Sequence, residues 1–298
     1  MTYDITTKTA PAMPKLGKGL DFVKLVLSQV SPDMREPIAP TLFDAAAAHI
    51  SATEFLYPDQ SWKELCGMID ALSAGSAGGK GQLQGYVEAM MRFARKHDEV
   101  ELQKLVEWQR NMKSKGANKE KPLRPDVSFW FPPSDVTNAA FIQNAMACEQ
   151  GNAHTQYYNM PEVEMADKIC GGHKQVTQTI RNIYDKARAG ALRATAEGVT
   201  GNPVLRVNMN ISCTPGEARN FFKRDLFNGT LGRVAFSYKA RGNRDGHIPR
   251  QGEYDEDFLK KLDAYIVRLQ ACKGRHVVKP LNKLADRLAL DMAALADL

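Results

Sequence analysis

The run Gly67-Met-Ile-Asp-Ala-Leu-Ser73 is mostly apolar and leads directly into the glycine-rich run Ala74-Gly-Ser-Ala-Gly-Gly-Lys-Gly81. Leu83, Val87 and Met90 then recur at the spacing of an amphipathic helix. We therefore predict a strand, a loop and a helix in immediate succession. In this context a glycine-rich loop can bind phosphate, because its backbone N–H groups and the helix N-terminus face the same anion.

The loop has the spacing of a phosphate loop, with a small residue followed by four residues and then Gly79-Lys80. In that motif the lysine reaches the β- and γ-phosphate oxygens, and a following Ser or Thr ligates Mg²⁺. Here Gly81 stands in place of the hydroxyl residue. The residues predicted to hold the nucleotide are Gly75, Ser76, Gly78, Gly79, Lys80, Gly81 and Gln82.

The missing hydroxyl at Gly81 leaves three interpretations open. In the first, the loop binds ATP, and Mg²⁺ is held through water and by an acid elsewhere. In the second, ATP binds without efficient hydrolysis. In the third, the loop is only a glycine-rich turn.

Further strands are predicted where β-branched and aromatic residues gather in short runs that end at turn residues. These runs lie at residues 127–131, 155–160, 204–211 and 234–238, and helical stretches separate them. Strands that alternate with helices form βαβ units. We therefore predict an α/β fold with a mainly parallel sheet covered by helices on both faces.

Helical patterns flank the predicted core, and the chain divides accordingly. We expect a mobile tail at residues 1–15, an N-terminal helical segment at 16–60, the α/β core at 61–242 and a C-terminal helical extension at 243–298. The apolar repeat of the extension is unfinished at the last residue, which predicts a truncated extension.

The composition excludes several classes of protein. Hydrophobic residues make up 43% of the chain, enough to fill a core, and no stretch is long and apolar enough for a membrane span or a signal peptide, so we expect a cytoplasmic protein. The five cysteines form no C-x-x-C pair, which argues against a zinc site or a disulfide framework. A net charge of +6 is compatible with a polyanionic partner. The basic run Lys113–Arg124 is either a solvated loop or a contact to DNA or phosphate.

Two glutamates follow the strand predicted at residues 155–160. Glu162 comes at the end of the strand, where a carboxylate can polarise the attacking water, and Glu164 is a candidate to bind the metal through water. Pro161 stands where an Asp is usual. The alternative for each glutamate is an ordinary carboxylate that stabilises the start of a helix.

A single arginine, Arg233, comes just before the last predicted strand, after a glycine-containing turn. It is a candidate arginine finger that acts on the nucleotide either within the chain or across a subunit interface. The alternative is a surface salt bridge.

Together four stretches resemble a bacterial domain-of-unknown-function family of P-loop proteins related to RecA-like helicase and primase-helicase cores of mobile elements. The likeness extends from about Leu20 to the C-terminus and depends on the order of the motifs. The resemblance implies a RecA-like ATPase core with Lys80 as the phosphate-loop lysine, Glu162 as the acid at the strand end and Arg233 as the arginine before the last strand. The stretches are Ser61–Gly67, Gly79–Gln82, Pro161–Asp167 and Phe227–Arg233.

Two functions remain as competing hypotheses. The first is an ATP-hydrolysing, homo-oligomeric, helicase-like protein that acts on single-stranded DNA during replication or transfer of a mobile element. The second is a degenerate nucleotide-binding scaffold that recruits other proteins without turnover, which Gly81 favours. A metabolic phosphotransferase is less consistent with the extra helical segments.

Overall fold

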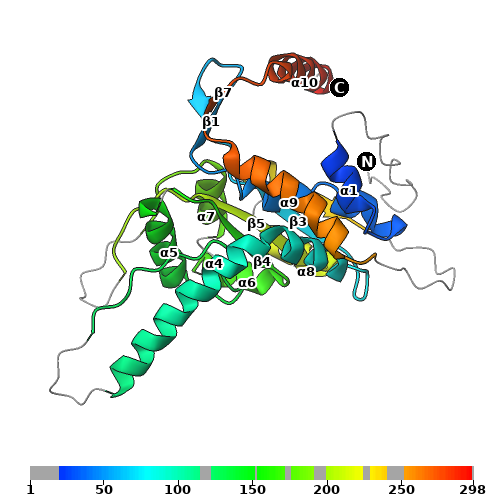
Figure 1. The fold of residues 1–298 in the computed structure, drawn as a ribbon. Helices are drawn as coiled ribbons and strands as arrows, with labels where there is room; N and C mark the ends of the chain where they lie inside the picture. The colour runs from blue at the N-terminus through cyan, green and yellow to red at the C-terminus, as the bar shows by residue number, and fades with distance from the viewer. Residues whose placement is uncertain are drawn as a thin grey trace.

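The computed structural model describes residues 20–114, 122–151, 153–171, 176–190, 199–223, 229–239 and 252–296. The central sheet has four parallel strands in the order β4-β5-β3-β6 (Figure 1). Their bounds are Ile69–Ser73 for β3, Gln156–Met160 for β4, Val207–Cys213 for β5 and Ala235–Tyr238 for β6. The prediction of an α/β fold with a parallel sheet is confirmed.

Alternation along the strands divides the side chains between two cores. On β3, Ile69 and Ala71 belong to one hydrophobic cluster and Leu72 belongs to the other. Successive side chains of a strand point to opposite faces, so both faces of the sheet must be covered.

Helices cover each face. The cluster that contains Leu72 receives side chains from the helices α1 (Asp21–Leu27), α2 (Arg35–Ile38), α3 (Leu42–Ala47), α4 (Gly81–Ser114) and α9 (Glu256–Ala271). The opposite cluster receives them from α5 (Asn138–Gln150), α6 (Val163–Ile169), α7 (Val176–Tyr184) and α8 (Pro215–Phe222). The 3-10 turns η1 (Pro32–Met34) and η3 (Leu231–Arg233) lie before α2 and β6.

A second, smaller sheet has the order β2-β1-β7, with β1 at Thr53–Leu56, β2 at Trp62–Lys63 and β7 at Gly274–His276. It projects from the main body and is followed by α10 (Pro280–Ala296), which stands apart from the other helices (Figure 1). The sequence predicted none of these three strands. No helix among the described residues has the length and apolar character needed to cross a membrane.

Two predicted elements differ from the structure. Residues 127–131 form no strand, because the carboxylate of Asp98 accepts the N–H groups of Trp130 (2.9 Å) and Phe131 (2.7 Å). The segment still lies beside β4, where Tyr157 donates its N–H to the Trp130 carbonyl at 2.8 Å. The helix expected over the C-terminal extension is divided by β7, which pairs with β1.

Candidate phosphate-binding site

Four strand ends meet at one edge of the main sheet. Because β3, β4, β5 and β6 are parallel, the segments that follow them lie on the same side. Ligands of open α/β sheets bind at this carboxyl edge. The segments begin with Ala74, Pro161, Thr214 and Lys239.

The glycine-rich loop joins β3 to α4 in a conformation that requires glycine. Gly79 has a φ of +91°, which L side chains rarely adopt. At Gly78 a Cβ would lie 2.7 Å from the Gly75 carbonyl oxygen, which accepts the Gly78 N–H at 3.0 Å. By contrast, nothing lies within 4 Å of a Cβ built at Gly75 or Gly81. The loop is therefore a defined turn that is open at both ends.

Five carbonyl groups of the loop accept hydrogen bonds, whereas most of its N–H groups have no partner among the described residues. Carbonyl oxygens with a donor are those of Ala74, Gly75, Gly78, Gly79 and Lys80. In a trans peptide the N–H of the next residue points the opposite way from the C=O. The N–H groups that point away from these bound carbonyls belong to Gly75, Ser76, Gly79, Lys80 and Gly81. Within the described part of the chain, none of these five N–H groups has a hydrogen-bond partner. Unpaired donors at the N-terminus of a long helix favour an anion.

Lys80 lies over the loop that precedes it. Its ammonium donates to the carbonyl oxygens of Ala74 (3.1 Å) and Cys213 (3.2 Å), at the ends of β3 and β5. The side chain also lines a large cavity. An anion at the loop can thus take over one of these hydrogen bonds without a change in the backbone.

Gln82 does not face this cavity. Its amide oxygen accepts the Ser31 N–H at 2.8 Å, and its amide nitrogen donates to Ser31 Oγ at 2.7 Å, both in buried positions. The Gln82 side chain therefore does not face the cavity where the nucleotide was predicted to bind. It anchors the start of α4 to Ser31, just before η1.

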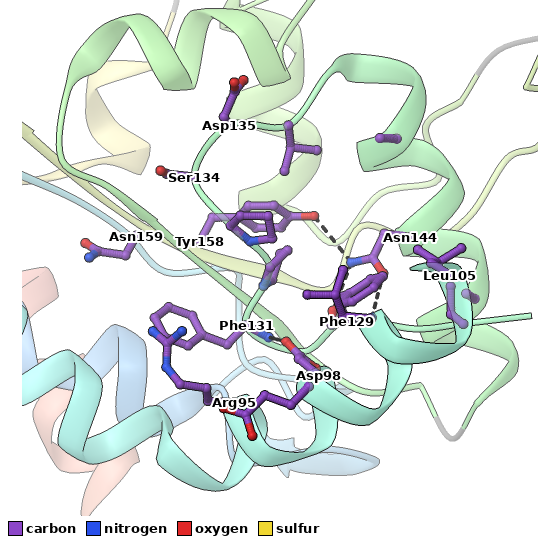
Figure 2. Close-up of a pocket in the computed structure, with 18 of the residues that line it drawn as sticks. Arg95, Asp98, Leu105, Phe129, Phe131, Ser134, Asp135, Asn144, Tyr158 and Asn159 are labelled. Carbon is purple, nitrogen blue, oxygen red and sulfur yellow. Dashed lines mark hydrogen bonds between the residues drawn. The ribbon is translucent and has the colours of Figure 1, made fainter. Parts of the chain in front are cut away.

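The cavity beside Lys80 has a volume of about 1140 Å³ and extends along α4 (Figure 2). Pockets for small ligands usually span about 300–1,000 Å³, so there is room for more than a nucleotide. Gly81, Asn159 and Ser212 line the end near Lys80.

Aromatic and amide side chains form the walls farther along the cavity (Figure 2). The guanidinium of Arg95 lies 4.8 Å from the ring centroid of Phe131. Asn144 donates to the Phe129 carbonyl oxygen at 2.9 Å and accepts the Phe129 N–H at 2.7 Å. Burial raises the pKa of Asp98, although its hydrogen bonds to His97 and the backbone act in the opposite direction. These polar groups hold the walls in place.

The two predicted glutamates lie at the carboxyl edge of the main sheet but outside the cavity. Glu162 is the N-cap residue of α6 and Glu164 is in its first turn, and both are exposed. Only Pro161 of this segment lines the cavity. Among the described residues, no three His, Cys, Asp or Glu side chains are grouped closely enough to hold a metal ion.

Arg233 lies at the opposite edge of the sheet, because it comes before β6, separated from it by Val234. The four residues of β6 alone span about 13 Å. Its guanidinium donates to the Gly229 carbonyl oxygen at 2.9 Å and to Asp185 at 3.3 Å, as in the surface salt bridge considered from the sequence. The structure therefore does not bring Arg233 to Lys80 within one chain.

One residue at the loop was missed by the sequence analysis. Lys239 follows β6, and its ammonium donates to the Gly78 carbonyl oxygen at 2.9 Å and to Asp33. A signal was present, because a lysine directly after the last predicted strand of a parallel sheet must lie at the carboxyl edge.

Comparison of the chain with protein-family models, curated proteins and solved structures finds no match.

Proposed function

We propose that this protein binds a nucleoside triphosphate at Gly75–Gly81 and is the ATP-dependent core of a helicase-like protein. The observation that carries the proposal is the loop between β3 and α4, where unpaired N–H groups and the Lys80 ammonium lie together at the carboxyl edge of a parallel sheet. A triphosphate needs both kinds of donor.

The strand order supports a RecA-like arrangement of the site. One strand, β5, separates β3 from β4, so Ser212 at the cavity lies between the loop and the segment that carries Glu162. In this proposal Glu162 would orient the attacking water, and Glu164 would hold Mg²⁺ through water in place of the hydroxyl that Gly81 lacks.

Single-stranded DNA is the proposed polymer substrate, on the basis of the resemblance and the net charge of +6. The DNA is proposed to contact a surface other than the large cavity, because acidic side chains outnumber basic ones among the residues that line it. The acidic side chains that line the cavity include Glu88, Glu99, Asp126 and Asp135.

A second candidate function is a nucleotide-binding scaffold without turnover. The observations that favour it are Gly81 and the exposed positions of Glu162 and Glu164 outside the cavity. Both functions use the proposed phosphate loop; they differ in hydrolysis and in whether the protein acts on DNA or recruits replication or transposition proteins.

The test is ATP binding and hydrolysis by the purified protein, with and without single-stranded DNA, for wild type, Lys80→Ala and Glu162→Gln. The ATPase proposal expects DNA-stimulated turnover that both substitutions abolish, with ATP binding lost in Lys80→Ala and retained in Glu162→Gln. Lys80-dependent binding without turnover would establish the scaffold. Equal absence of binding in wild type and Lys80→Ala would mean that the loop is only a turn.

A further inference from the structure

Lys239 ties the phosphate loop to a distant part of the chain. Its ammonium contacts the Gly78 carbonyl oxygen at 2.9 Å and Asp33, and only 12% of its side chain is exposed. The other loop carbonyls described above are bound by neighbours within the loop or α4, or by Lys80 itself. Gly78 is thus the carbonyl whose orientation depends on another element of the fold.

The Gly78–Gly79 peptide needs such a restraint. Both residues are glycines, which reach positive and negative φ with similar ease, so this peptide plane can rotate at little steric cost. Rotation would turn the Gly79 N–H from one side of the loop to the other, because C=O and N–H of one trans peptide point in opposite directions. With its C=O held by Lys239, the Gly79 N–H points away from Lys239 and has no partner within the chain as described.

The lysine is itself held by the N-terminal turn. Asp33 accepts a hydrogen bond from the Ser31 hydroxyl at 2.5 Å, and Ser31 is in turn paired with Gln82 at the start of α4. Burial alone would raise the pKa of Asp33, but hydrogen bonds from Lys239 and Ser31 hold it below its usual value. Asp33 is therefore an anion that fixes the ammonium near the loop.

We infer that Lys239 is a positioning residue of the phosphate site, which holds the Gly78 carbonyl so that the Gly79 N–H is available to a triphosphate. The inference rests on the proposed nucleotide site. It adds Lys239, which follows β6, and its anchor Asp33 to the loop residues predicted from the sequence to hold the nucleotide.

The experiment measures the dissociation constant of ATP for wild type, Lys80→Ala, Lys239→Met and Lys239→Arg. Lys63→Met is the matched control, because Lys63 forms an ion pair with Asp59 at 2.7 Å on the small sheet and its loss changes the net charge equally. A urea midpoint for each variant shows that it is folded. We expect ATP to bind about tenfold more weakly to Lys239→Met, with partial recovery in Lys239→Arg and no change in Lys63→Met.

The outcomes separate the inference from the proposed function. If wild type binds ATP in a Lys80-dependent way and Lys239→Met binds within about twofold of it, the positioning role is wrong and the nucleotide site stands. An equal loss in Lys239→Arg and Lys239→Met would assign the effect to packing rather than to a hydrogen bond, which also overturns the role. If wild type and Lys80→Ala bind ATP equally weakly, the proposed function fails and the inference with it.

Discussion

The carboxyl groups of Asp44 of α3 and Asp70 of β3 interact in the core, where neither residue is more than 3% exposed. Asp44 accepts the Ala45 N–H at 2.6 Å, and one oxygen of Asp70 has no hydrogen-bond partner among the residues that the structure describes. Burial raises the pKa of Asp70 to about 7. Burial, and then the charge of Asp70, raise the pKa of Asp44 well above its usual value. At least one of the two carboxyl groups is therefore protonated near neutral pH.

The effect of Asp70→Asn on stability should depend on pH. The unfolded chain releases the Asp70 proton near pH 3.8 and the folded chain near pH 7, so this group makes wild type less stable as pH rises through that window. Asn does not titrate. We expect Asp70→Asn to gain up to about 1.4 kcal/mol per pH unit relative to wild type in this window, and no more above it.

Urea unfolding of both proteins between about pH 5 and pH 8 checks this expectation. The free energies of unfolding should diverge as pH rises toward neutrality. Two curves that stay parallel throughout would show that Asp70 is ionised in the folded protein.

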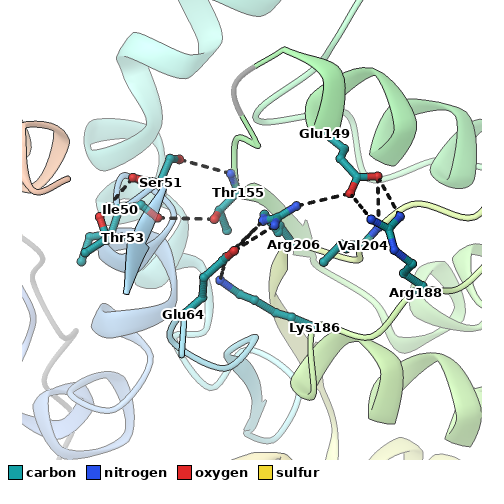
Figure 3. Close-up of polar contacts among 10 residues, drawn as sticks. All are labelled: Ile50, Ser51, Thr53, Glu64, Glu149, Thr155, Lys186, Arg188, Val204 and Arg206. Carbon is teal, nitrogen blue, oxygen red and sulfur yellow. Dashed lines mark hydrogen bonds and ion pairs between the residues drawn. The ribbon is translucent and has the colours of Figure 1, made fainter. Parts of the chain in front are cut away.

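The partly buried carboxylate of Glu64 joins the small sheet to the main one (Figure 3). It accepts hydrogen bonds from Arg206 at 2.8, 3.0 and 3.1 Å and from Lys186 at 3.0 Å. Glu64→Ala leaves two poorly solvated cations, and we expect a loss of about 2 kcal/mol in the free energy of unfolding. Glu54→Ala removes an exposed pair with Arg275 and should cost less than about 0.5 kcal/mol.

Chemical denaturation of the two variants under identical conditions provides the comparison. Because hydrogen bonds from Arg206 and the charge of Lys186 outweigh burial and hold the pKa of Glu64 below its usual value, its contribution should be present at neutral pH and decline as pH falls below 4.5. Equal losses in Glu64→Ala and Glu54→Ala would mean that the cluster contributes no more than a surface pair.

The position of Arg233 predicts that, if this arginine acts on the nucleotide, it does so on the nucleotide of a neighbouring subunit. Lys80 and Arg233 lie at opposite edges of the sheet, so an Arg233 finger must come from a second copy packed head to tail. Lys80→Ala and Arg233→Ala should then each lack ATPase activity, while their mixture regains part of it, because some interfaces combine an intact Lys80 with an intact Arg233.

Steady-state ATPase measurements on the separate variants and on a mixture of equal amounts test this arrangement. Full activity of Arg233→Ala alone would show that the arginine only pairs with Asp185. If both variants are inactive alone and in the mixture, Arg233 does not act on the nucleotide of a neighbouring subunit.

Local pattern determined much of the fold. The strand, loop and helix at residues 67–94 could be predicted from the sequence. The hydrophobic period, the glycine content and the spacing of apolar residues along a helix are all properties of nearby residues. The four strands of the main sheet were found for the same reason. Thr137 caps α5, because its hydroxyl accepts the Ala140 N–H. Even the edge occupied by Arg233 could have been read from the sequence, since a residue before a parallel strand lies at the amino edge.

Contacts between distant residues decided the rest. Gln82 looks like part of the loop motif, but a partner 51 positions earlier turns its side chain away from the cavity. Lys239 reaches the loop across 161 positions, and β7 pairs with β1 although the residues around it have a helical pattern. The sequence by itself determined the four strands of the main sheet, the glycine-rich loop after β3 and the helix that follows it. The tertiary structure alone decided the order of the strands and the side chains that surround the loop, because no local period encodes which distant segments pack together.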